Sequence, residues 1–180
     1  MESDSALVMS IGTGDKTAFR DLVERHKKSA YNIALGLVGN RDDAYDISQE
    51  AFLRVYRSAK TYDKAQPFQP WFYTIIANLC RTWLKRRSSR DNRMVDLDDA
   101  SYLLVSDDDP EATVVRKEQV ARLREALKQL SFDDREIIML QHFRNMSYDE
   151  IAKTLEIPRG TVMSRLYYAR KRLAKFMGTV

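Results

Sequence analysis

An acidic segment interrupts the chain at residues 89–112, where SRDNRMVDLDDASYLLVSDDDPEA contains eight acidic and two basic residues. The segment lacks sustained helical periodicity, and its aspartate triplet followed by proline is typical of a loop. Both flanking segments are basic: residues 1–88 have 14 bases against 10 acids, and residues 113–180 have 14 against 8. The sequence therefore predicts two basic domains, at 1–90 and 113–180, joined by an acidic flexible linker over 91–112.

Both predicted domains show the apolar spacing of α-helices, and glycine and proline are scarce, with six and four in 180 residues. In the first domain Ile47, Ala51, Phe52 and Val55 fall on one helical face. In the second, Ser147 has the position of a helix N-cap, with a glutamate three residues later. No run alternates with a period of two for long enough to suggest a sheet. We therefore expect an all-α protein, with a helical bundle followed by helices over about 114–130, 133–143, 148–155 and 160–176.

The composition is that of a protein able to bury a core, since 44% of the residues are hydrophobic and 31% are charged. No apolar run approaches the roughly 20 residues that a bilayer needs, and the polar start MESDS lacks the order of a signal peptide. Cys80 has no partner for an internal disulfide, and neither His26 nor His142 belongs to a metal-binding arrangement. We expect a cytoplasmic protein without membrane insertion, cofactor or metal, in which Cys80 is a packing residue.

The segment SYDEIAKTLEIPRGTVMSRLYYARKRLAK at 147–175 has the pattern of a DNA-binding helix-turn-helix. A Pro-Arg-Gly lies between its two helices, and every charged residue after Glu156 is basic. In such motifs the second helix enters the major groove while bases neutralise phosphates. The alternative is a surface helix whose basic end complements its macrodipole. The inward positions are Ile151, Ala152 and Leu155 on the first helix and Val162, Leu166 and Ala169 on the second.

The helix expected over 43–58 also has an outward face. With its apolar positions turned to the core, Asp46, Gln49, Glu50 and Leu53 cluster on the opposite side. A leucine exposed beside acids and an amide indicates a docking patch for another protein. The alternatives are a solvated helix face and acid–base chemistry, but nothing nearby supplies the pocket, histidine or metal ligands that such chemistry needs.

Residues 62–90 combine aromatic rings with basic side chains. This mixture is expected where unpaired bases stack on rings while cations hold the backbone. Helical spacing turns about half of the rings inward, with Phe72 as a clear case. Asn78 and Arg81, three residues apart, share a face with Lys85, which makes this face a candidate for binding nucleic acid.

Three segments resemble bacterial extracytoplasmic-function (ECF, group 4) RNA polymerase sigma factors of the sigma-70 family. EIAKTLEIPRGTVMSRLYYARKRL resembles region 4.2, DAYDISQEAFLRVYRS at 43–58 resembles region 2.2, and residues 70–90 resemble regions 2.3 and 2.4. They occur in the family's order, with a linker where the family has one. The resemblance implies a region 2 bundle at 1–90 and a region 4 helix-turn-helix at 113–180. It also implies promoter-specific initiation through the −35 and −10 elements, with promotion of DNA melting.

The resemblance assigns roles to two surfaces of the first domain. The docking patch, Asp46, Gln49, Glu50 and Leu53, is the implied contact with core polymerase. Asn78 matches a frequent asparagine of the family, and its face is implied to read the −10 element and to hold a nucleotide flipped from the non-template strand. The implied −10 set is Tyr62, Phe68, Trp71, Asn78, Arg81, Lys85 and Arg86.

In the second domain the later helix is implied to bind the −35 element. Three residues depart from the family pattern: Glu156 stands where glycine is frequent, Met163 where Lys or Arg is common, and Tyr168 where Arg is frequent. Promoter preference is therefore expected to differ from the family norm. We expect the N-terminal exposed residues of this helix to contact the edges of nucleobases. The later Lys and Arg residues, Arg172 included, are expected to bind phosphates. The implied −35 set is Arg159, Thr161, Met163, Ser164, Arg165, Tyr167, Tyr168, Arg170 and Lys171.

The implied partners are core RNA polymerase, promoter DNA and an anti-sigma factor, and the free protein is expected to be a monomer. It is not expected to be an enzyme, because polymerase performs the nucleotidyl transfer. Two other interpretations remain. A stand-alone helix-turn-helix regulator with an N-terminal helical interaction domain would bind duplex DNA without core polymerase. A nucleic-acid-processing enzyme would turn over with divalent metal, although no acidic cluster has metal-ligand spacing beside a basic groove.

Overall fold

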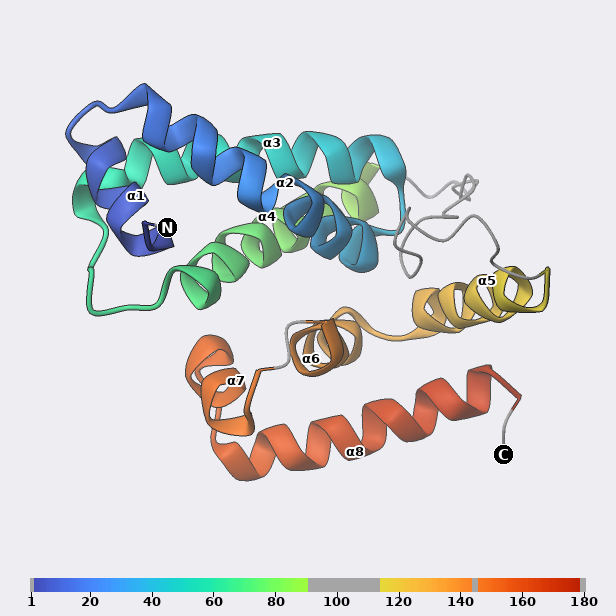
Figure 1. Cartoon of the computed structure of the whole chain (residues 1–180). Helices are drawn as coiled ribbons and strands as arrows, with labels where there is room; N and C mark the ends of the chain where they lie inside the picture. Colours follow the sequence, from blue (N-terminus) through green and yellow to red (C-terminus); the bar gives the residue numbers. More distant parts are fainter. Residues whose placement is uncertain (1, 91–113, 144–145, 179–180) are drawn as a thin grey trace. The chain divides into compact units, whose positions relative to one another are not determined.

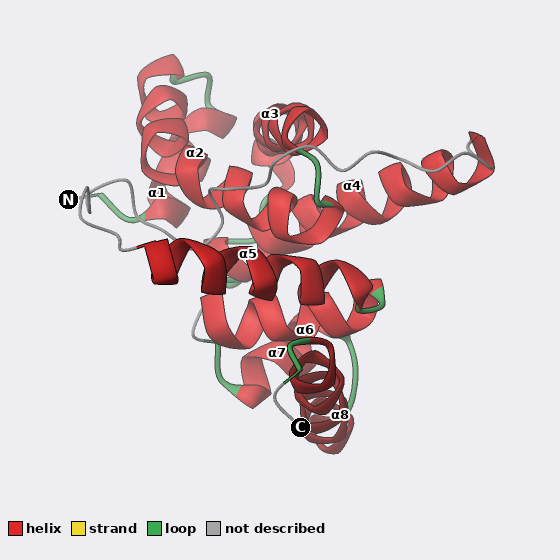
Figure 2. Cartoon of the chain, turned by 90° about the vertical axis from the view of Figure 1, so that its right-hand side faces the viewer, coloured by secondary structure: helices red, strands yellow, loops and turns green. Residues whose placement is uncertain are grey.

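The computed structural model describes residues 2–90, 114–143 and 146–178. In those ranges the regular structure consists of α-helices and one short 3₁₀ turn, without a strand (Figures 1 and 2). The prediction of an all-α protein is confirmed. None of the described helices combines the length and the apolar character that a membrane span needs.

The chain divides into two compact units. The first unit comprises Met1–Ala34 and Asp42–Met94, and the second comprises Leu35–Arg41 and Val95–Val180. The predicted linker over 91–112 lies outside the described residues. Each unit has a hydrophobic core of its own.

The first unit packs its helices around aliphatic and aromatic side chains. Its α3 buries Ile47, Ala51, Phe52 and Val55, the face expected from the sequence. Phe52 contacts Phe72 of α4 with 5.0 Å between the ring centroids. This packing leaves the opposite side of α3 in solvent. The elements are α1 (Asp4–Gly12), α2 (Lys16–Val38) as far as Ala34, α3 (Arg41–Ser58) from Asp42, the 3₁₀ turn η1 (Ala59–Thr61) and α4 (Phe68–Arg90).

The short helix α1 was not foreseen from the sequence. Ser3 caps it by accepting from the backbone N–H of Ala6 at 3.2 Å, and α1 buries Leu7, Val8 and Ile11. Asp4, in its first turn, lies 3.0 Å from Nε2 of His26 on α2 and 3.2 Å from a guanidinium nitrogen of Arg25. His26 is therefore a buried residue that connects α2 with α1.

The second unit has the predicted helix-turn-helix. The last helix, α8, packs against the three that precede it and buries Val162, Leu166 and Ala169. Ile151 of α7 is fully buried in the same core. The inward faces predicted for the two helices thus meet in this unit, although Ala152 and Leu155 are only partly buried. The elements are α5 (Val114–Gln129), α6 (Phe132–Phe143), α7 (Tyr148–Leu155) and α8 (Arg159–Phe176).

The ends of α7 show why its bounds were predictable. The Ser147 hydroxyl accepts from the Glu150 N–H at 3.2 Å, and the Glu150 carboxylate accepts from the Ser147 N–H at 2.8 Å, so the capping box is complete. These hydrogen bonds from the Ser147 backbone and hydroxyl lower the pKa of Glu150. The capping box therefore stabilises the fold above the carboxyl's unfolded pKa, and this contribution is lost as the pH falls through its lowered folded value.

The turn between α7 and α8 places Glu156 in the left-handed region, with φ 54° and ψ 41°. A side chain at such a position costs about 1 kcal/mol that glycine avoids. We expect Glu156→Gly to raise the free energy of unfolding by up to about 1 kcal/mol, measured by urea denaturation of the full chain. Lys153→Gly, in the interior of α7, should instead lower it by about 1 kcal/mol. Lower stability for Glu156→Gly would show that the turn is unstrained.

An ion pair fastens α8 to α6. Nε and Nη2 of Arg172 each donate to one carboxylate oxygen of Asp134 at 2.7 Å. The backbone N–H of Asp134 donates in turn to the Ser131 hydroxyl at 3.2 Å, the hydrogen bond of a helix N-cap. Asp134 is buried whereas the Arg172 side chain is about half exposed. The geometry is the bidentate one that makes such pairs strong.

We expect Asp134→Asn to lower the free energy of unfolding by about 1 to 2 kcal/mol, because the pair is charge-assisted but half-solvated on the arginine side. The neighbouring Asp133 is exposed and lies in the same first turn of α6, so Asp133→Asn is a matched control with an expected loss under about 0.5 kcal/mol. Urea unfolding followed by circular dichroism measures both. Equal losses would mean that the helix dipole, and not the Arg172 pair, carries the effect.

Candidate functional site

The outward face of α3 carries the predicted docking patch. Asp46, Gln49 and Leu53 are exposed, and Leu53 keeps 45% of its surface in solvent. Glu50 is half-buried beneath two bases of its own helix, with an oxygen 3.5 Å from Nε of Arg54 and 3.4 Å from a guanidinium nitrogen of Arg57. The four residues thus lie together, but the charge of Glu50 is already partly balanced within the chain.

Two tyrosines widen this face beyond the predicted patch. Tyr45 and Tyr56 are 58% and 42% exposed, and they lie eight residues before and three after Leu53 on α3. Tyr56 also packs edge-on against Phe19 of α2, with 5.2 Å between ring centroids. Sequence reasoning missed both tyrosines, although Tyr45 lies four residues before Gln49 and Tyr56 three residues after Leu53. Large exposed rings next to an exposed leucine are typical of protein interfaces.

One side of α4 presents polar and basic groups to solvent. Asn78, Lys85 and Arg86 are exposed and Arg81 is half-buried. The amide oxygen of Asn78 accepts from a guanidinium nitrogen of Arg81 at 3.1 Å. The opposite side buries Phe72, as expected, so α4 separates a core face from a face suited to a nucleic-acid strand.

The aromatic residues at the start of α4 differ in their roles. Trp71 is half-buried, whereas Phe68 is buried, with its ring stacked on Phe72 and tilted against His26. Phe68 is therefore a core residue and does not lie on a face that could contact DNA. Tyr62 is half-buried, and its hydroxyl is bonded within the protein. The position of an aromatic residue near Lys and Arg in the sequence did not show whether its ring is buried or partly exposed.

Arg87, one of the bases near the rings, has a structural position. Its guanidinium carbon lies 4.8 Å from the centre of the Trp83 ring, and one nitrogen lies 3.2 Å from a carboxylate oxygen of Asp43 on α3. Burial raises the pKa of Asp43, and the Arg87 charge opposes that rise. This cluster fastens the C-terminal half of α4 to the start of α3.

The outer surface of α8 brings most of the predicted −35 residues together. Arg159, Met163, Ser164, Tyr167 and Lys171 are exposed on it. Their helix carries six bases and no acid between residues 159 and 176. The remaining members are Arg165, Tyr168 and Arg170, which are exposed, and Thr161, which is half-buried.

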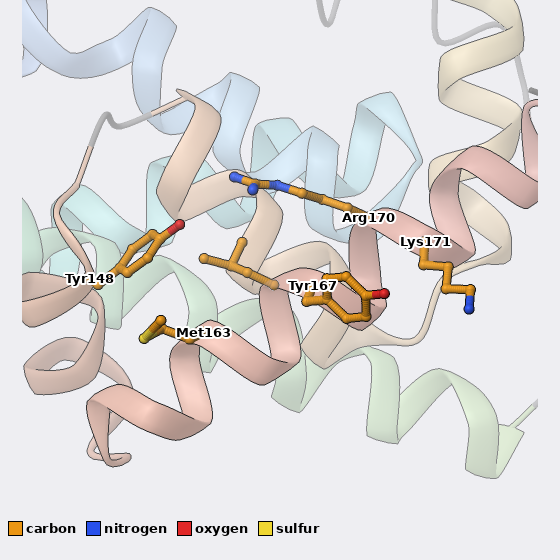
Figure 3. A pocket seen from close by; sticks show the side chains of 6 residues that line it. Tyr148, Met163, Tyr167, Arg170 and Lys171 are labelled. Carbon is orange, nitrogen blue, oxygen red and sulfur yellow. The ribbon is translucent and has the colours of Figure 1, made fainter.

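An open groove of about 650 Å³ lies beside this surface (Figure 3). Its wall on α8 is formed by Met163, Tyr167, Arg170 and Lys171, with Leu166 at its base, and Tyr148 lines it from the first turn of α7. Tyr148 was absent from the predicted set because its neighbours in the sequence are those of a helix cap. The groove combines apolar surface with cationic groups and a phenol, so it suits a partner that offers both methyl groups and phosphates.

Arg172 corrects one part of the prediction. It was expected to hold a phosphate, but its guanidinium is engaged by Asp134 through two bonds of 2.7 Å. That hydrogen bonding raises the pKa of Arg172 further above its ordinary value. Arg159 has a weaker pairing, 3.5 Å from Asp149 with both side chains well exposed, which leaves it able to exchange partners.

The comparisons with known proteins agree on the class. The family model for sigma-70 region 2 matches residues 22–90, and the model for sigma-70 region 4 matches residues 121–173. The RNA polymerase sigma-H factor of Pseudomonas aeruginosa is 31% identical over 97% of this chain and 93% of its own length. The ECF RNA polymerase sigma factor SigW of Bacillus subtilis is 30% identical over 93% of both chains.

A solved structure has the same fold. The sigma factor RpoE of Bartonella quintana, in complex with the anti-sigma factor NepR, superposes with a TM-score of 0.69 at 22% identity, covering 89% of this chain and 96% of that one. The two matching regions are those of sigma-70 proteins, which direct RNA polymerase to promoters. The chain belongs to the ECF sigma factors of the sigma-70 family, and it directs promoter-specific transcription initiation by RNA polymerase.

Proposed function

We propose that three helix faces share the work of this sigma factor. The docking patch on α3 binds core polymerase, the polar face of α4 binds the melted −10 element, and the outer face of α8 binds the −35 element. One observation carries the proposal. On each helix the side chains concerned lie in solvent on one side, while the opposite side is buried in a core.

The α3 face suits a protein partner with basic and apolar groups. Leu53 and the two tyrosines offer apolar surface, and Asp46 together with neighbouring acids offers negative charge. Arg54 and Arg57 shield Glu50 in the free chain. A basic residue of core polymerase that replaced them would exchange one ion pair for another, so Glu50 contributes more to specificity than to affinity.

The α4 face suits a single strand. Asn78 has an amide that donates and accepts, and Lys85 and Arg86 are exposed cations that lie about two turns further along the helix. Unpaired bases stack on rings and leave their edges for such groups. Promoter melting then follows from binding energy, because the unpaired strand is bound and the duplex is not.

The α8 face suits the major groove of a duplex. Four of the six basic residues of α8, Arg170, Lys171, Arg172 and Lys175, lie after its first two turns, which is the order expected when the N-terminal end of a recognition helix meets base edges. We add Tyr148 to this face as a phosphate contact, because its phenol lines the same groove as Arg170 and Lys171. The finer assignment of the chain to group 4 of the family accords with a region 2 and a region 4 joined by one linker.

We also propose the setting in which the protein acts. It works in the cytoplasm with polymerase, which performs the nucleotidyl transfer, and it is a monomer when free. An anti-sigma factor is a fitting further partner, since RpoE of Bartonella quintana, which shares the fold, was solved with one. The exposed apolar groups of α3 and the groove on α8 are surfaces that such a partner would cover.

Transcription in vitro from genomic DNA fragments tests the proposal. Core polymerase with this protein should initiate at new, defined start sites, and the sequences upstream of them give both promoter elements. A stand-alone regulator would bind those duplexes alone and leave the start sites of core polymerase unchanged, and a processing enzyme would cleave or modify the DNA with divalent metal. Either result would overturn the proposal.

A further inference from the structure

Tyr62 connects α1 with the loop that precedes α4. Its hydroxyl donates to the backbone carbonyl of Gln66 and lies 3.0 Å from the hydroxyl oxygen of Ser5, in the first turn of α1. A phenol has one proton, so with Gln66 as acceptor the Ser5 hydroxyl is the donor to Tyr62. One oxygen atom thus closes the loop from Tyr62 to Gln66 and fastens it to α1.

The loop has further bonds of its own. The Asp63 carboxylate accepts from the backbone N–H of Ala65 at 2.9 Å, and the Asp63 carbonyl accepts from the N–H of Gln66 at 3.0 Å. These bonds set the shape of the turn, and the Tyr62 hydroxyl sets where the turn lies against α1.

Helix α1 makes a second close contact with the segment from Ala59 to Gln66. A Cβ at Gly12, the last residue of α1, would lie 3.1 Å from the carbonyl oxygen of Ala59 in η1, so only glycine allows this approach without displacement. Ser5 and Gly12 are seven residues apart and share one side of the helix. The adjoining side, with Leu7, Val8 and Ile11, is buried in the core. Helix α1 therefore contacts both the core and the segment from Ala59 to Gln66.

The ring of Tyr62 supports Trp71. Their centroids are 4.7 Å apart with the planes at 50°, and Phe68 lies against Trp71 at 6.1 Å. Trp71 is half-buried, so part of the indole remains available to another ring. It precedes Asn78 by seven residues and Lys85 by fourteen, which places the three on one side of α4.

We propose that α1, through Tyr62, is a brace that holds Trp71 as a stacking platform for an unpaired base of the −10 element. Tyr62, expected from the sequence to contact DNA itself, is on this view a positioning residue that acts through Trp71. The ligand is the aromatic face of a single-stranded nucleotide, because an indole beside cations binds bases of any identity in this way. The proposal rests on the −10 role proposed for α4.

The test uses holoenzyme reconstituted from core polymerase and the full chain. The probe is a single-stranded oligonucleotide with the −10 element of a promoter mapped with this holoenzyme, together with a series in which one nucleotide at a time is abasic. Tyr62→Phe keeps the ring and removes the hydroxyl, and Ser5→Ala removes its donor. Tyr31→Phe is the matched control, since Tyr31 is also a half-buried tyrosine, lies on α2 and belongs to neither predicted DNA-binding set.

We expect Tyr62→Phe and Ser5→Ala to weaken binding of the intact oligonucleotide about threefold to tenfold, the usual effect of a lost hydrogen bond. One abasic oligonucleotide should bind wild type and both variants equally, because it lacks the base that stacks on Trp71. Duplex −35 DNA and Tyr31→Phe should show no change. Wild-type affinity in both variants would overturn the proposal. An equal loss of affinity for every abasic oligonucleotide would also overturn it, because it would indicate general destabilisation.

Two further variants separate this proposal from the one on which it rests. Asn78→Ala and Lys85→Ala should each weaken the same oligonucleotide if the α4 face binds the −10 element. If they do so while Tyr62→Phe and Ser5→Ala do not, the brace alone is wrong. If none of the four variants has an effect, the −10 assignment of α4 is wrong as well.

Discussion

Leu53→Asp should weaken binding to core polymerase by about 30-fold or more, because it removes the central apolar contact of the docking patch and requires a new charge to lose its water. Fully burying a leucine side chain is worth about 1.5 to 3 kcal/mol, and about 2 kcal/mol corresponds to that factor. The free protein should fold normally, since Leu53 is 45% exposed and contributes little to the core. Affinity for core polymerase and the circular dichroism spectrum give the two measurements.

Charge reversal in the same patch should have a smaller effect. Glu50→Lys removes a partner of Arg54 and Arg57 and places a third base beside them. The control is Glu24→Lys on α2, which likewise reverses an acid paired with a base of its own helix, Lys27 at 2.7 Å, but at an exposed position outside the docking patch. We expect Glu50→Lys to reduce binding to core polymerase and Glu24→Lys to leave that binding unchanged. Unreduced binding by Leu53→Asp, with an intact spectrum, would remove α3 from the polymerase interface.

The features that local chemistry determines could be predicted from the sequence. The bounds of α7 agree because a capping box begins the helix and a left-handed residue ends it, and both are set within a few residues. The buried face of α3 agrees because a period of 3.6 leaves only one way to turn Ile47, Phe52 and Val55 inward. The outward position of Leu53 follows from the same geometry.

What depends on distant residues could not be predicted. Arg172 is separated from Asp134 by 38 positions, and nothing near either residue shows that α8 passes over α6. Phe68 and Trp71 have similar neighbours, yet one lies under His26 and Phe72 and the other reaches solvent. In each case the environment is made by an element elsewhere in the chain.

The helix α1 was missed for a different reason. Nine residues are too few to form a stable helix alone, and the segment becomes helical because the core accepts its apolar side. Its effect on Tyr62 then changes the interpretation of a residue that sequence reasoning placed on the DNA. A pattern of rings and bases predicts the kind of ligand, whereas the contacts decide which ring meets it.

Substitutions in the recognition helix α8 should give the second large effect. Those at base-contacting residues should change sequence preference, whereas those at phosphate-contacting residues should lower affinity for all sequences. Arg159, Met163, Ser164 and Tyr167 lie in its first turns and are expected at base edges, so alanine there should change which −35 sequences are preferred. The cost is about 1 to 3 kcal/mol at the base concerned, or roughly 5-fold to 150-fold. Met163 should favour a thymine methyl, since a thioether offers no strong hydrogen-bond donor to guanine.

Lys171 should behave in the opposite way. As a phosphate contact it adds charge without reading sequence, so Lys171→Ala should weaken all promoters alike and reduce the slope of log affinity against log salt by about one unit. Arg172→Ala is the informative comparison, because its pairing with Asp134 predicts lost stability and little change in that slope. Initiation by each variant across a randomised −35 library, at several salt concentrations, distinguishes the groups. If Lys171→Ala changes sequence preference while the variants at Arg159, Met163 and Ser164 do not, α8 presents a different side to the groove.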